Sequence, residues 1–314
     1  MSKISKFIFP FLTGKISLKN PPFKVWIEIT NLCNQNCLTC PNNMISEDKK
    51  RSMSIEEFSK ISNALPKDVE EVNLFHRGEP FLHKDLLTFI KILKNKGKFV
   101  RLYTNGTLLK KTFPITKLFE NPPDMIAFSV PNPLLEQTND KNEYLNTSLK
   151  NLESLLAFRK QKKVKKIFIK LEILSLGKEK DAKAKKHLKD NYKLQTIDSI
   201  TFRGPHNWGG NIESFDIDKK RKHNQCTFPW YALVIFADGT VTTCPQDFFG
   251  NLALGNIFDD DLQTIWNSKK MHDLRKLHVK RNIEEGHPCY NCDRIHRKTF
   301  LKVPLEYLRI FWEK

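Results

Sequence analysis

Cys33-Asn34-Gln35-Asn36-Cys37-Leu38-Thr39-Cys40 is the stretch that decides how the sequence is interpreted. It follows residues 23–30, where apolar and polar side chains alternate as they do in a half-buried β-strand. One loop with the spacing C-x3-C-x2-C can turn three thiols toward one point. Three thiols can hold an iron–sulfur cubane and leave its fourth iron open. A zinc site or three buried thiols are the alternatives for this triplet taken alone.

The rest of the N-terminal two thirds alternates strands with helices. Strands are predicted at 23–30, 71–75, 99–104, 125–130, 167–174 and 197–202. Helices are predicted after Ser54, at 86–96, at 146–160 and at 180–192. This order predicts a parallel sheet with helices outside it, closed fully or partly into a barrel. Because chemistry gathers at the C-terminal ends of such strands, the cysteine loop lies at the expected end.

Three further strand ends carry polar motifs. Gly78-Glu79-Pro80 follows the second strand, Thr104-Asn105-Gly106 ends the third, and Ser129 and Asn132 lie at the end of the fourth. A carboxylate and exposed carbonyl groups are suitable partners for an ammonium group. The alternative for Asn105-Gly106 is an ordinary turn, and for the fourth strand an ordinary strand-end loop.

Candidate catalytic residues come from three strands. Glu172 lies between Leu171 and Ile173, so its side chain points to the opposite sheet face, which in a barrel is the interior. A lone carboxylate in the interior needs a partner, so Glu172 is a candidate site residue. The alternative is that Glu172 is a charge on the surface. Arg203 follows the sixth strand and is preferred over His206 for binding substrate or transferring protons. Tyr103 lies on the third predicted strand.

A second cysteine group has the spacing C-x17-C-x44-C-x2-C and consists of Cys226, Cys244, Cys289 and Cys292. Four thiols that end in a C-x2-C pair can hold tetrahedral zinc or a [4Fe-4S] cluster, and zinc is the better interpretation of the group alone. A hairpin turning at Asp238-Gly239 and a helix from Asp261 toward Leu274 lie between these cysteines.

The two groups together resemble those of radical S-adenosylmethionine (SAM) enzymes with a C-terminal SPASM/twitch domain. The resemblance also covers Gly78-Glu79-Pro80, Thr104-Asn105-Gly106, the segment 203–210 and Trp266-Asn267-Ser268. It implies an α/β fold, with a partial (β/α)6 TIM-like barrel and a small α+β twitch domain. Arg77 stands where many members have another glycine, so the local backbone is expected to differ.

The resemblance also implies cofactors and their ligands. Cys33, Cys37 and Cys40 would hold the [4Fe-4S] cluster whose open iron chelates SAM, and the second group would hold an auxiliary [4Fe-4S] cluster. SAM would be bound by Gly78, Glu79, Pro80, Thr104, Asn105, Gly106, Ser129 and Asn132.

The implied reaction begins with reductive cleavage of SAM to a 5′-deoxyadenosyl radical that abstracts hydrogen from substrate. We expect net oxidation of a small polar, carbohydrate-like substrate, with one electron passing to the auxiliary cluster. The predicted catalytic residues are Arg203, Glu172 and Tyr103. Modification of a ribosomally made peptide and epimerisation are the alternative reactions, and in an epimerisation Tyr103 or Tyr290 could donate a hydrogen atom. A zinc-stabilised protein that binds nucleic acid is a distant alternative, because it leaves the glycine-glutamate-proline and threonine-asparagine-glycine motifs unexplained.

Composition bounds the remaining expectations. No apolar run of about 18 residues occurs, and oxygen-sensitive clusters need a reducing compartment, so a cytoplasmic enzyme is expected. The net charge of +18 favours anionic partners, such as a flavodoxin- or ferredoxin-type electron donor, although biased composition alone explains it equally well. We divide the chain into an N-terminal arm (1–22), the barrel (23–212), the twitch domain (213–298) and a basic amphipathic helix (299–314). The arm and this helix could make a peripheral membrane contact.

Overall fold

The fold was analysed in a computed structural model, which describes residues 3–110, 113–135, 139–163, 167–212, 223–297, 299–300 and 303–304. Its centre is a nine-stranded sheet with the strand order β6-β5-β4-β3-β2-β1-β7-β8-β9. The strands are β1 (Lys24–Ile27), β2 (Glu71–Asn73), β3 (Phe99–Thr104), β4 (Met125–Val130), β5 (Phe168–Leu174), β6 (Ser199–Arg203), β7 (Ala232–Ile235), β8 (Thr240–Thr242) and β9 (Gly255–Asn256).

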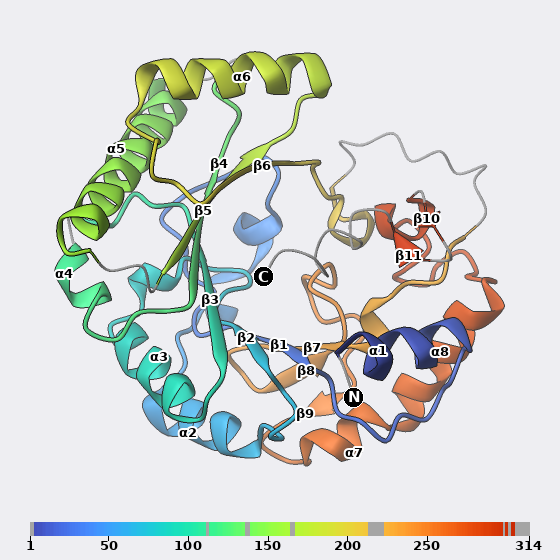
Figure 1. The fold of residues 1–314 in the computed structure, drawn as a ribbon. Helices are drawn as coiled ribbons and strands as arrows, with labels where there is room; N and C mark the ends of the chain where they lie inside the picture. The colour runs from blue at the N-terminus through green and yellow to red at the C-terminus, as the bar shows by residue number, and fades with distance from the viewer. Residues whose placement is uncertain are drawn as a thin grey trace.

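Strands β1 to β6 are parallel and adjacent in chain order, which confirms the predicted α/β barrel architecture. Strand β6 ends one edge of the sheet, so the barrel is partial. Helices cover the outer side of this arc (Figure 1). They are α2 (Ile55–Ala64), α3 (Leu86–Asn95), α4 (Ile115–Leu118), α5 (Asn139–Gln161) and α6 (Lys178–Asn191).

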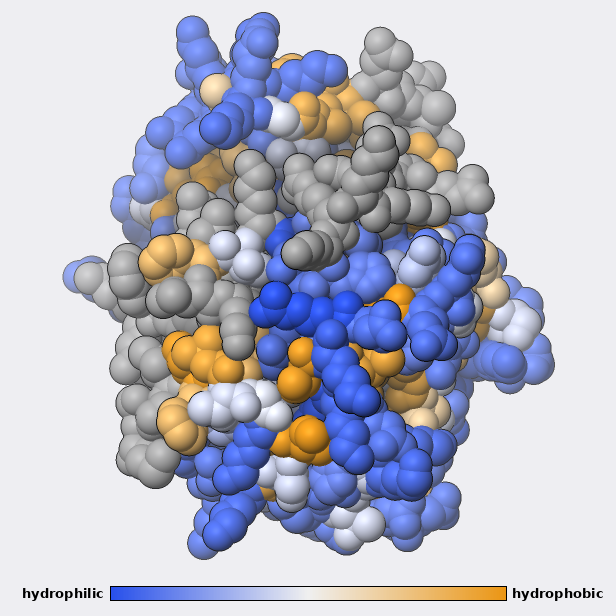
Figure 2. Space-filling model, turned by 90° about the vertical axis from the view of Figure 1, so that its right-hand side faces the viewer, coloured by the Kyte–Doolittle hydropathy of each residue, from blue (hydrophilic) through white to orange (hydrophobic). Residues whose placement is uncertain are grey.

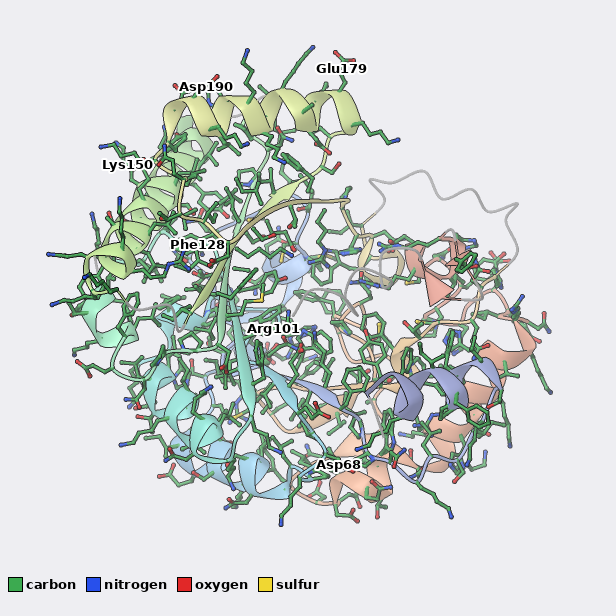
Figure 3. All side chains as sticks on the ribbon, viewed as in Figure 1. Asp68, Arg101, Phe128, Lys150, Glu179 and Asp190 are labelled. Atoms are coloured by element: carbon green, nitrogen blue, oxygen red, sulfur yellow. The ribbon has the colours of Figure 1, made fainter. Side chains whose placement is uncertain are left out.

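Local sequence signals explain several of these elements. Ser54 and Glu57 form the predicted capping box at the start of α2, with both reciprocal hydrogen bonds present. Apolar residues of the helices pack against the sheet, and Phe58 of α2 stacks on Phe89 of α3 at 4.1 Å between ring centroids. The charged faces of α5 and α6 point outward, as Lys150, Glu179 and Asp190 do in Figure 3.

The C-terminal part of the chain continues the same sheet. Strand β7 pairs in parallel with β1, from Lys24 with Ala232 to Ile27 with Ile235, and β8 and β9 follow antiparallel. The hairpin was predicted, whereas its direct pairing with the first barrel strand was not. The segments that carry the two cysteine groups are therefore joined by backbone hydrogen bonds along a shared strand edge.

The predicted helix from Asp261 toward Leu274 is wrong in one respect, because it is two helices, α7 (Leu262–Trp266) and α8 (Lys269–Lys280). Asn267 breaks it by exchanging side-chain hydrogen bonds with the backbone of Leu18. Ser268 then caps α8 by accepting a hydrogen bond from the Met271 N–H.

The two ends of the chain have different secondary structure. The arm contains helix α1 (Lys3–Leu12), and its Phe7 and Phe11 pack on Tyr231 and Trp230. The sequence predicts a helix over 299–314. The described residues of this range are extended instead, with β10 (Thr299–Phe300) antiparallel to β11 (Val303–Pro304), so the predicted helix is wrong at these residues. Residues 301–302 and 305–314 lie outside the described residues.

Among the coloured residues on the face shown in Figure 2, hydrophilic ones predominate and hydrophobic ones form separate patches. This agrees with a charged-residue content of 28%. No helix within the described ranges is long and apolar enough to cross a membrane.

Candidate active site

The first cysteine group lies in the loop after β1, at the C-terminal ends of the barrel strands. Two contacts from the β2 end hold this loop. The Glu79 N–H donates to the Leu32 carbonyl at 2.8 Å, next to Cys33. Gly78 packs so closely that a Cβ there would lie 2.3 Å from the Thr30 carbonyl oxygen and 2.6 Å from that of Leu32. Only glycine permits this approach, so Gly78 fixes the cysteine loop against β2.

Glu79 also organises the motif after β3. It is 3% exposed and accepts hydrogen bonds from the Thr104 hydroxyl at 2.7 Å and from the Asn105 N–H at 2.8 Å. Burial raises the pKa of Glu79 to about 7, although these hydrogen bonds favour the charged form. Its neighbour Pro80 is buried and begins the short 3-10 turn Pro80–Leu82. The predicted SAM-binding motifs are thus one hydrogen-bonded unit.

The β3 motif reaches the cysteine loop and the neighbouring strand as well. The Asn105 side-chain amide donates to Asn34 Oδ1 at 2.8 Å, within the cysteine stretch. Gly106 has φ +76°, and a Cβ there would lie 2.4 Å from the Phe128 ring. Asn105-Gly106 was interpreted from the sequence either as an ordinary turn or as part of the site. The two interpretations are compatible, because the turn packs against the cysteine loop and the neighbouring strand.

A cavity of about 440 Å³ opens beside the cysteine loop. Its walls come from the loop, from the ends of β4, β5 and β6, and from α5. Polar and aromatic lining residues include Cys37, Ser129, Tyr144, Glu172, Arg203 and Trp208. The predicted contact Asn132 is not among the lining residues. It is fully buried, and its side chain bonds the Leu174 carbonyl at 3.0 Å and the Leu134 N–H at 3.0 Å.

Glu172 is the charged centre of this cavity, on the interior side as predicted. Its carboxylate accepts hydrogen bonds from Lys170 at 2.9 Å, from Arg203 Nη1 at 3.2 Å and from the Tyr103 hydroxyl at 3.3 Å. Burial acts to raise the pKa of Glu172, but the charges of Arg203 and Lys170 outweigh it and lower the pKa below its ordinary value. Burial also raises the pKa of Tyr103, so its hydroxyl keeps its proton. The three predicted catalytic residues therefore meet at one point.

From Arg203 a polar chain leads toward the second cysteine group. Arg203 Nε donates to His206 Nε2 at 2.7 Å, and the Asp293 carboxylate, directly after Cys292, lies 3.6 Å from His206 Nδ1. Burial and the charge of Arg203 hold the pKa of His206 well below its usual range, so the imidazole is neutral at pH 7. His206 thus links the cavity to the C-terminal cysteines.

The cysteines themselves fit an iron–sulfur cofactor. All seven are free thiols. Burial raises the pKa of Cys33 and of Cys40 to about 11 and that of Cys292 to about 12. Such thiols become thiolates only beside a bound cation, as metal ligation provides.

The thiols of the second cysteine group influence one another. After burial, the neighbouring thiols of Cys226 and Cys292 are the next causes that raise the pKa of Cys244, so these sulfurs lie near one another. The Gln246 N–H also donates to Cys244 Sγ at 3.3 Å. No three His, Cys, Asp or Glu side chains of the described residues have the geometry that holds a single ion. The fit therefore rests on which thiols are present and where they lie.

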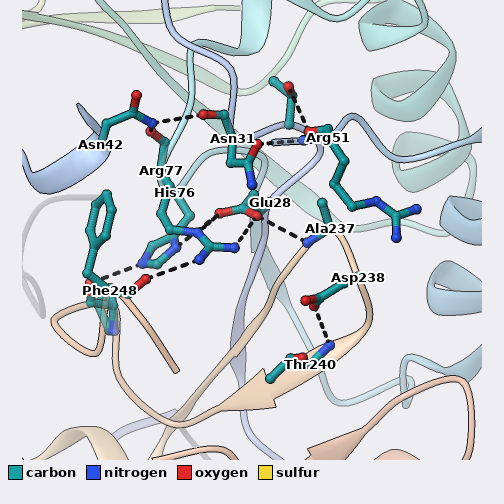
Figure 4. Close-up of polar contacts among 12 residues, drawn as sticks. Glu28, Asn31, Asn42, Arg51, His76, Arg77, Ala237, Asp238, Thr240 and Phe248 are labelled. Atoms are coloured by element: carbon teal, nitrogen blue, oxygen red, sulfur yellow. Dashed lines mark hydrogen bonds and ion pairs between the residues drawn. The ribbon is translucent and has the colours of Figure 1, made fainter. Parts of the chain in front are cut away.

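Sequence reasoning missed a buried ionic cluster around Glu28 and Arg77 (Figure 4). Glu28, immediately after β1, is 0% exposed. Arg77 donates to both of its carboxylate oxygens, at 2.5 and 2.7 Å, and the Ala237 N–H donates to one of them at 3.2 Å. Burial acts to raise the pKa of Glu28, but hydrogen bonds from Arg77 and His76 lower it to about 2.

The same cluster also contacts the C-terminal part of the chain. The Arg77 guanidinium lies 3.8 Å from the Phe236 ring centre and donates to the Phe248 carbonyl at 3.2 Å. His76 contacts the Pro245 carbonyl at 3.0 Å, next to Cys244. Arg77 was noted in the sequence only as a departure from glycine, and its partner Glu28 carried no signal beyond its place in a strand.

Comparison with known families identifies the class of protein. The chain belongs to the radical SAM superfamily, whose family model matches residues 27–190, more than half of the chain. The SPASM model, described as an iron-sulfur cluster-binding domain, matches residues 226–293. The cofactors of this class are a [4Fe-4S] cluster with SAM, and auxiliary iron–sulfur clusters in the SPASM domain.

Among curated relatives, the chain is similar to the S-adenosyl-L-methionine-dependent 2-deoxy-scyllo-inosamine dehydrogenase of Niallia circulans. The two are 23% identical over 285 residues, which cover 87% of this chain and 93% of the relative. Similarity to the 7,8-dihydro-6-hydroxymethylpterin dimethyltransferase of Methanocaldococcus jannaschii is local, at 34% identity over 97 residues. The chain spans 19% of that relative.

Solved structures share the fold. BtrN in complex with AdoMet and 2-DOIA has a TM-score of 0.58 at 17% identity, covering 88% of this chain and 94% of BtrN. Native anSMEcpe with bound AdoMet and the Cp18Cys peptide also has a TM-score of 0.58, at 16% identity, covering 93% of this chain and 95% of anSMEcpe. The radical SAM barrel fold predicted from the sequence is confirmed.

Proposed function

We propose that this radical SAM enzyme oxidises a small polar, carbohydrate-like substrate by two electrons. Cys33, Cys37 and Cys40 hold the SAM-binding [4Fe-4S] cluster, and Cys226, Cys244, Cys289 and Cys292 hold an auxiliary [4Fe-4S] cluster. When bound, these groups and SAM supply a 5′-deoxyadenosyl radical that takes one hydrogen atom from substrate, and an acceptor for one electron. The remaining proton must leave to a group of the protein or to water.

The observation that carries the proposal is the polar wall of the cavity, which is lined by the first cysteine loop and is linked through His206 to Asp293, next to Cys292. Glu172 is held as a carboxylate, so it can accept a hydrogen bond and then the proton from a substrate hydroxyl. Arg203 is 44% exposed in its side chain and is oriented by Glu172 and His206 through Nη1 and Nε. Among the described residues, its Nη2 has no hydrogen-bond partner, so it can donate to a substrate oxygen.

Tyr103 and Lys170 orient the Glu172 carboxylate from the other side. Because Tyr103 keeps its proton, its role is to donate a hydrogen bond. Glu79, Thr104 and Asn105 form the wall against which SAM is expected to bind, and Gly78 and Gly106 keep that wall close to the cysteine loop. The full-length similarity to a dehydrogenase acting on an inosamine supports a hydroxylated substrate.

The electron that starts the reaction must come from outside the chain. We expect a small acidic redox protein of flavodoxin or ferredoxin type, because a net charge of +18 attracts an acidic surface. A cytoplasmic location agrees with such a donor and with the reducing conditions that iron–sulfur clusters need.

The cluster assignment is tested by iron and sulfide analysis with Mössbauer spectra, on anaerobically reconstituted wild type and on the Cys33/Cys37/Cys40→Ala variant. We expect two clusters in the wild type and one in the variant. Wild-type protein that takes up no iron would overturn the enzyme assignment. A variant that keeps only zinc would remove the electron acceptor and with it the oxidation.

The reaction is tested with SAM, dithionite and 2-deoxy-scyllo-inosamine as a probe substrate. Loss of two hydrogens from the probe, with one 5′-deoxyadenosine formed per product, is the expected result. The second candidate, modification of a peptide, is favoured by the equal fold similarity to the peptide-bound anSMEcpe structure. Substrate-dependent 5′-deoxyadenosine formation with a peptide but with no polyol probe would support it instead.

A further inference from the structure

Trp208 lies at the boundary between the two halves of the site. It belongs to segment 203–210, which leaves β6 and leads toward the second cysteine group. Its indole N–H donates to the Thr39 carbonyl at 2.6 Å, between Cys37 and Cys40. Its ring lines the cavity and packs edge-on against Phe248, with 5.2 Å between centroids.

The backbone at this point is unusual. Trp208 has φ +51°, in the left-handed region that bulky side chains rarely adopt. Gly209 and Gly210 follow with φ +71° and +95°. A strained conformation persists only where surrounding contacts determine it, and such residues cluster at functional sites. Here the strain aims the indole back at the first cysteine loop.

The other side of the same segment is fixed to the second group. The Asn207 side chain donates to the Asn291 carbonyl at 2.5 Å and accepts from the Asp293 N–H at 3.0 Å. Gly210 lies so close that a Cβ there would be 2.7 Å from Asn291 Cβ. Asn291 is between Cys289 and Cys292, so four consecutive residues, 207–210, contact both cysteine loops.

We propose that Trp208 is a positioning residue that fixes the first cysteine loop relative to the second. Its N–H holds the Thr39 carbonyl, while Asn207 and Gly210 lock the same segment to the Cys289–Cys292 loop. Residues 207–210 thereby help to set the separation of the two cluster sites. This inference rests on the cluster assignments proposed above.

The test compares three variants of the full-length, anaerobically reconstituted protein. Trp208→Phe removes the N–H donor and keeps a ring against Phe248. Trp266→Phe is the matched control, because its indole also donates to a backbone carbonyl, that of Asn20, at 2.9 Å. Gly210→Ala disturbs the segment from the side of Asn291.

EPR spectra of the reduced, SAM-bound protein and the rate of 5′-deoxyadenosine formation are the readouts, with iron content and thermal midpoint measured alongside. We expect Trp208→Phe to change the signal of the SAM-binding cluster and to slow 5′-deoxyadenosine formation by about fivefold, the rate equivalent of one hydrogen bond. Trp266→Phe should change only the thermal midpoint. Gly210→Ala should alter the signals of both clusters, because the segment transmits the displacement.

The possible failures are distinguishable. If wild type binds no iron, the proposed function fails first. If wild type holds two clusters and Trp208→Phe matches Trp266→Phe in spectrum and rate, the positioning role is overturned. If Gly210→Ala changes the auxiliary signal alone, the coupling is overturned. Should Trp208→Phe not fold, the Gly210→Ala spectra still decide the question.

Discussion

Replacing Arg77 with methionine tests whether the buried ionic cluster holds the two parts of the chain together. Glu28 has no exposure to solvent, and Arg77 provides the guanidinium that neutralises it. Methionine keeps an unbranched apolar stem in place of the Arg77 side chain and removes the guanidinium, so the carboxylate is left buried beside weaker donors.

Breaking a buried pair from one side costs about 3–5 kcal/mol. The unfolding entropy of 314 residues at about 2.1 cal/mol/K per residue converts each kcal/mol into a change of about 1.5 °C in the thermal midpoint. Arg77→Met should therefore lower the midpoint by about 5–8 °C. The double variant Glu28→Gln/Arg77→Met should recover more than half of this loss, because a neutral amide replaces the uncompensated charge.

Thermal unfolding followed by far-UV circular dichroism at pH 7 measures these shifts. Arg51→Met is the matched control, because its pair with Glu57 is also 2.5 Å long but 39% and 27% exposed. Exposed pairs contribute at most about 1 kcal/mol, or about 1.5 °C. If Arg77→Met loses no more than Arg51→Met, or if the double variant is as unstable as the single one, the reasoning about an uncompensated charge is refuted.

Three other outcomes are expected. Gly106→Ala should destabilise the protein by about 2–4 kcal/mol, because it strains a left-handed backbone and displaces the Phe128 ring. Gly97→Ala is the control, since Gly97 also has a positive φ but no atom lies within 4 Å of its added Cβ. This variant should cost about 1 kcal/mol in the same thermal assay. Ionised Glu28 should contribute stability of order 3 kcal/mol, because its pKa is lowered to about 2 in the folded protein. This contribution should be complete above pH 4.5 and be lost as the pH falls from 4.5 toward 2. The thermal midpoints of wild type and Glu28→Gln should therefore converge on acidification. Arg203→Met should raise KM for the probe substrate by about 10- to 100-fold, as expected for a charged hydrogen bond, while 5′-deoxyadenosine formed without substrate stays at the wild-type rate.

The strands and the strand-end motifs were predictable because their signals are local. The strands predicted at 99–104 and 125–130 are β3 and β4, with the same bounds in the structure. Once the sheet is parallel, the ends of β1, β2 and β3 must lie at one edge, so Cys33, Glu79 and Thr104 come together without knowledge of any side-chain contact.

Contacts between distant segments left no comparable signal. Glu28 and Arg77 are 49 residues apart, and nothing in either local pattern specifies the other as its partner. The break at Asn267 depends on Leu18, 249 residues away, so helical spacing alone predicted one helix where there are two. Asn132 was polar and well placed in sequence, but tertiary contacts turn its amide to Leu174 and away from the cavity.

The long-range contacts missed from sequence share one consequence for the chemistry. Strand β7 is paired with β1, Arg77 holds Phe236 and Phe248, and Trp208 holds Thr39. Each joins the barrel to the C-terminal part of the chain. A substrate that loses a hydrogen atom on one side and an electron on the other must be held while both acceptors stay in place. The oxidation that we propose therefore requires a rigid connection between the two groups, and the sheet that the barrel shares with the segment carrying Cys226 and Cys244 supplies one.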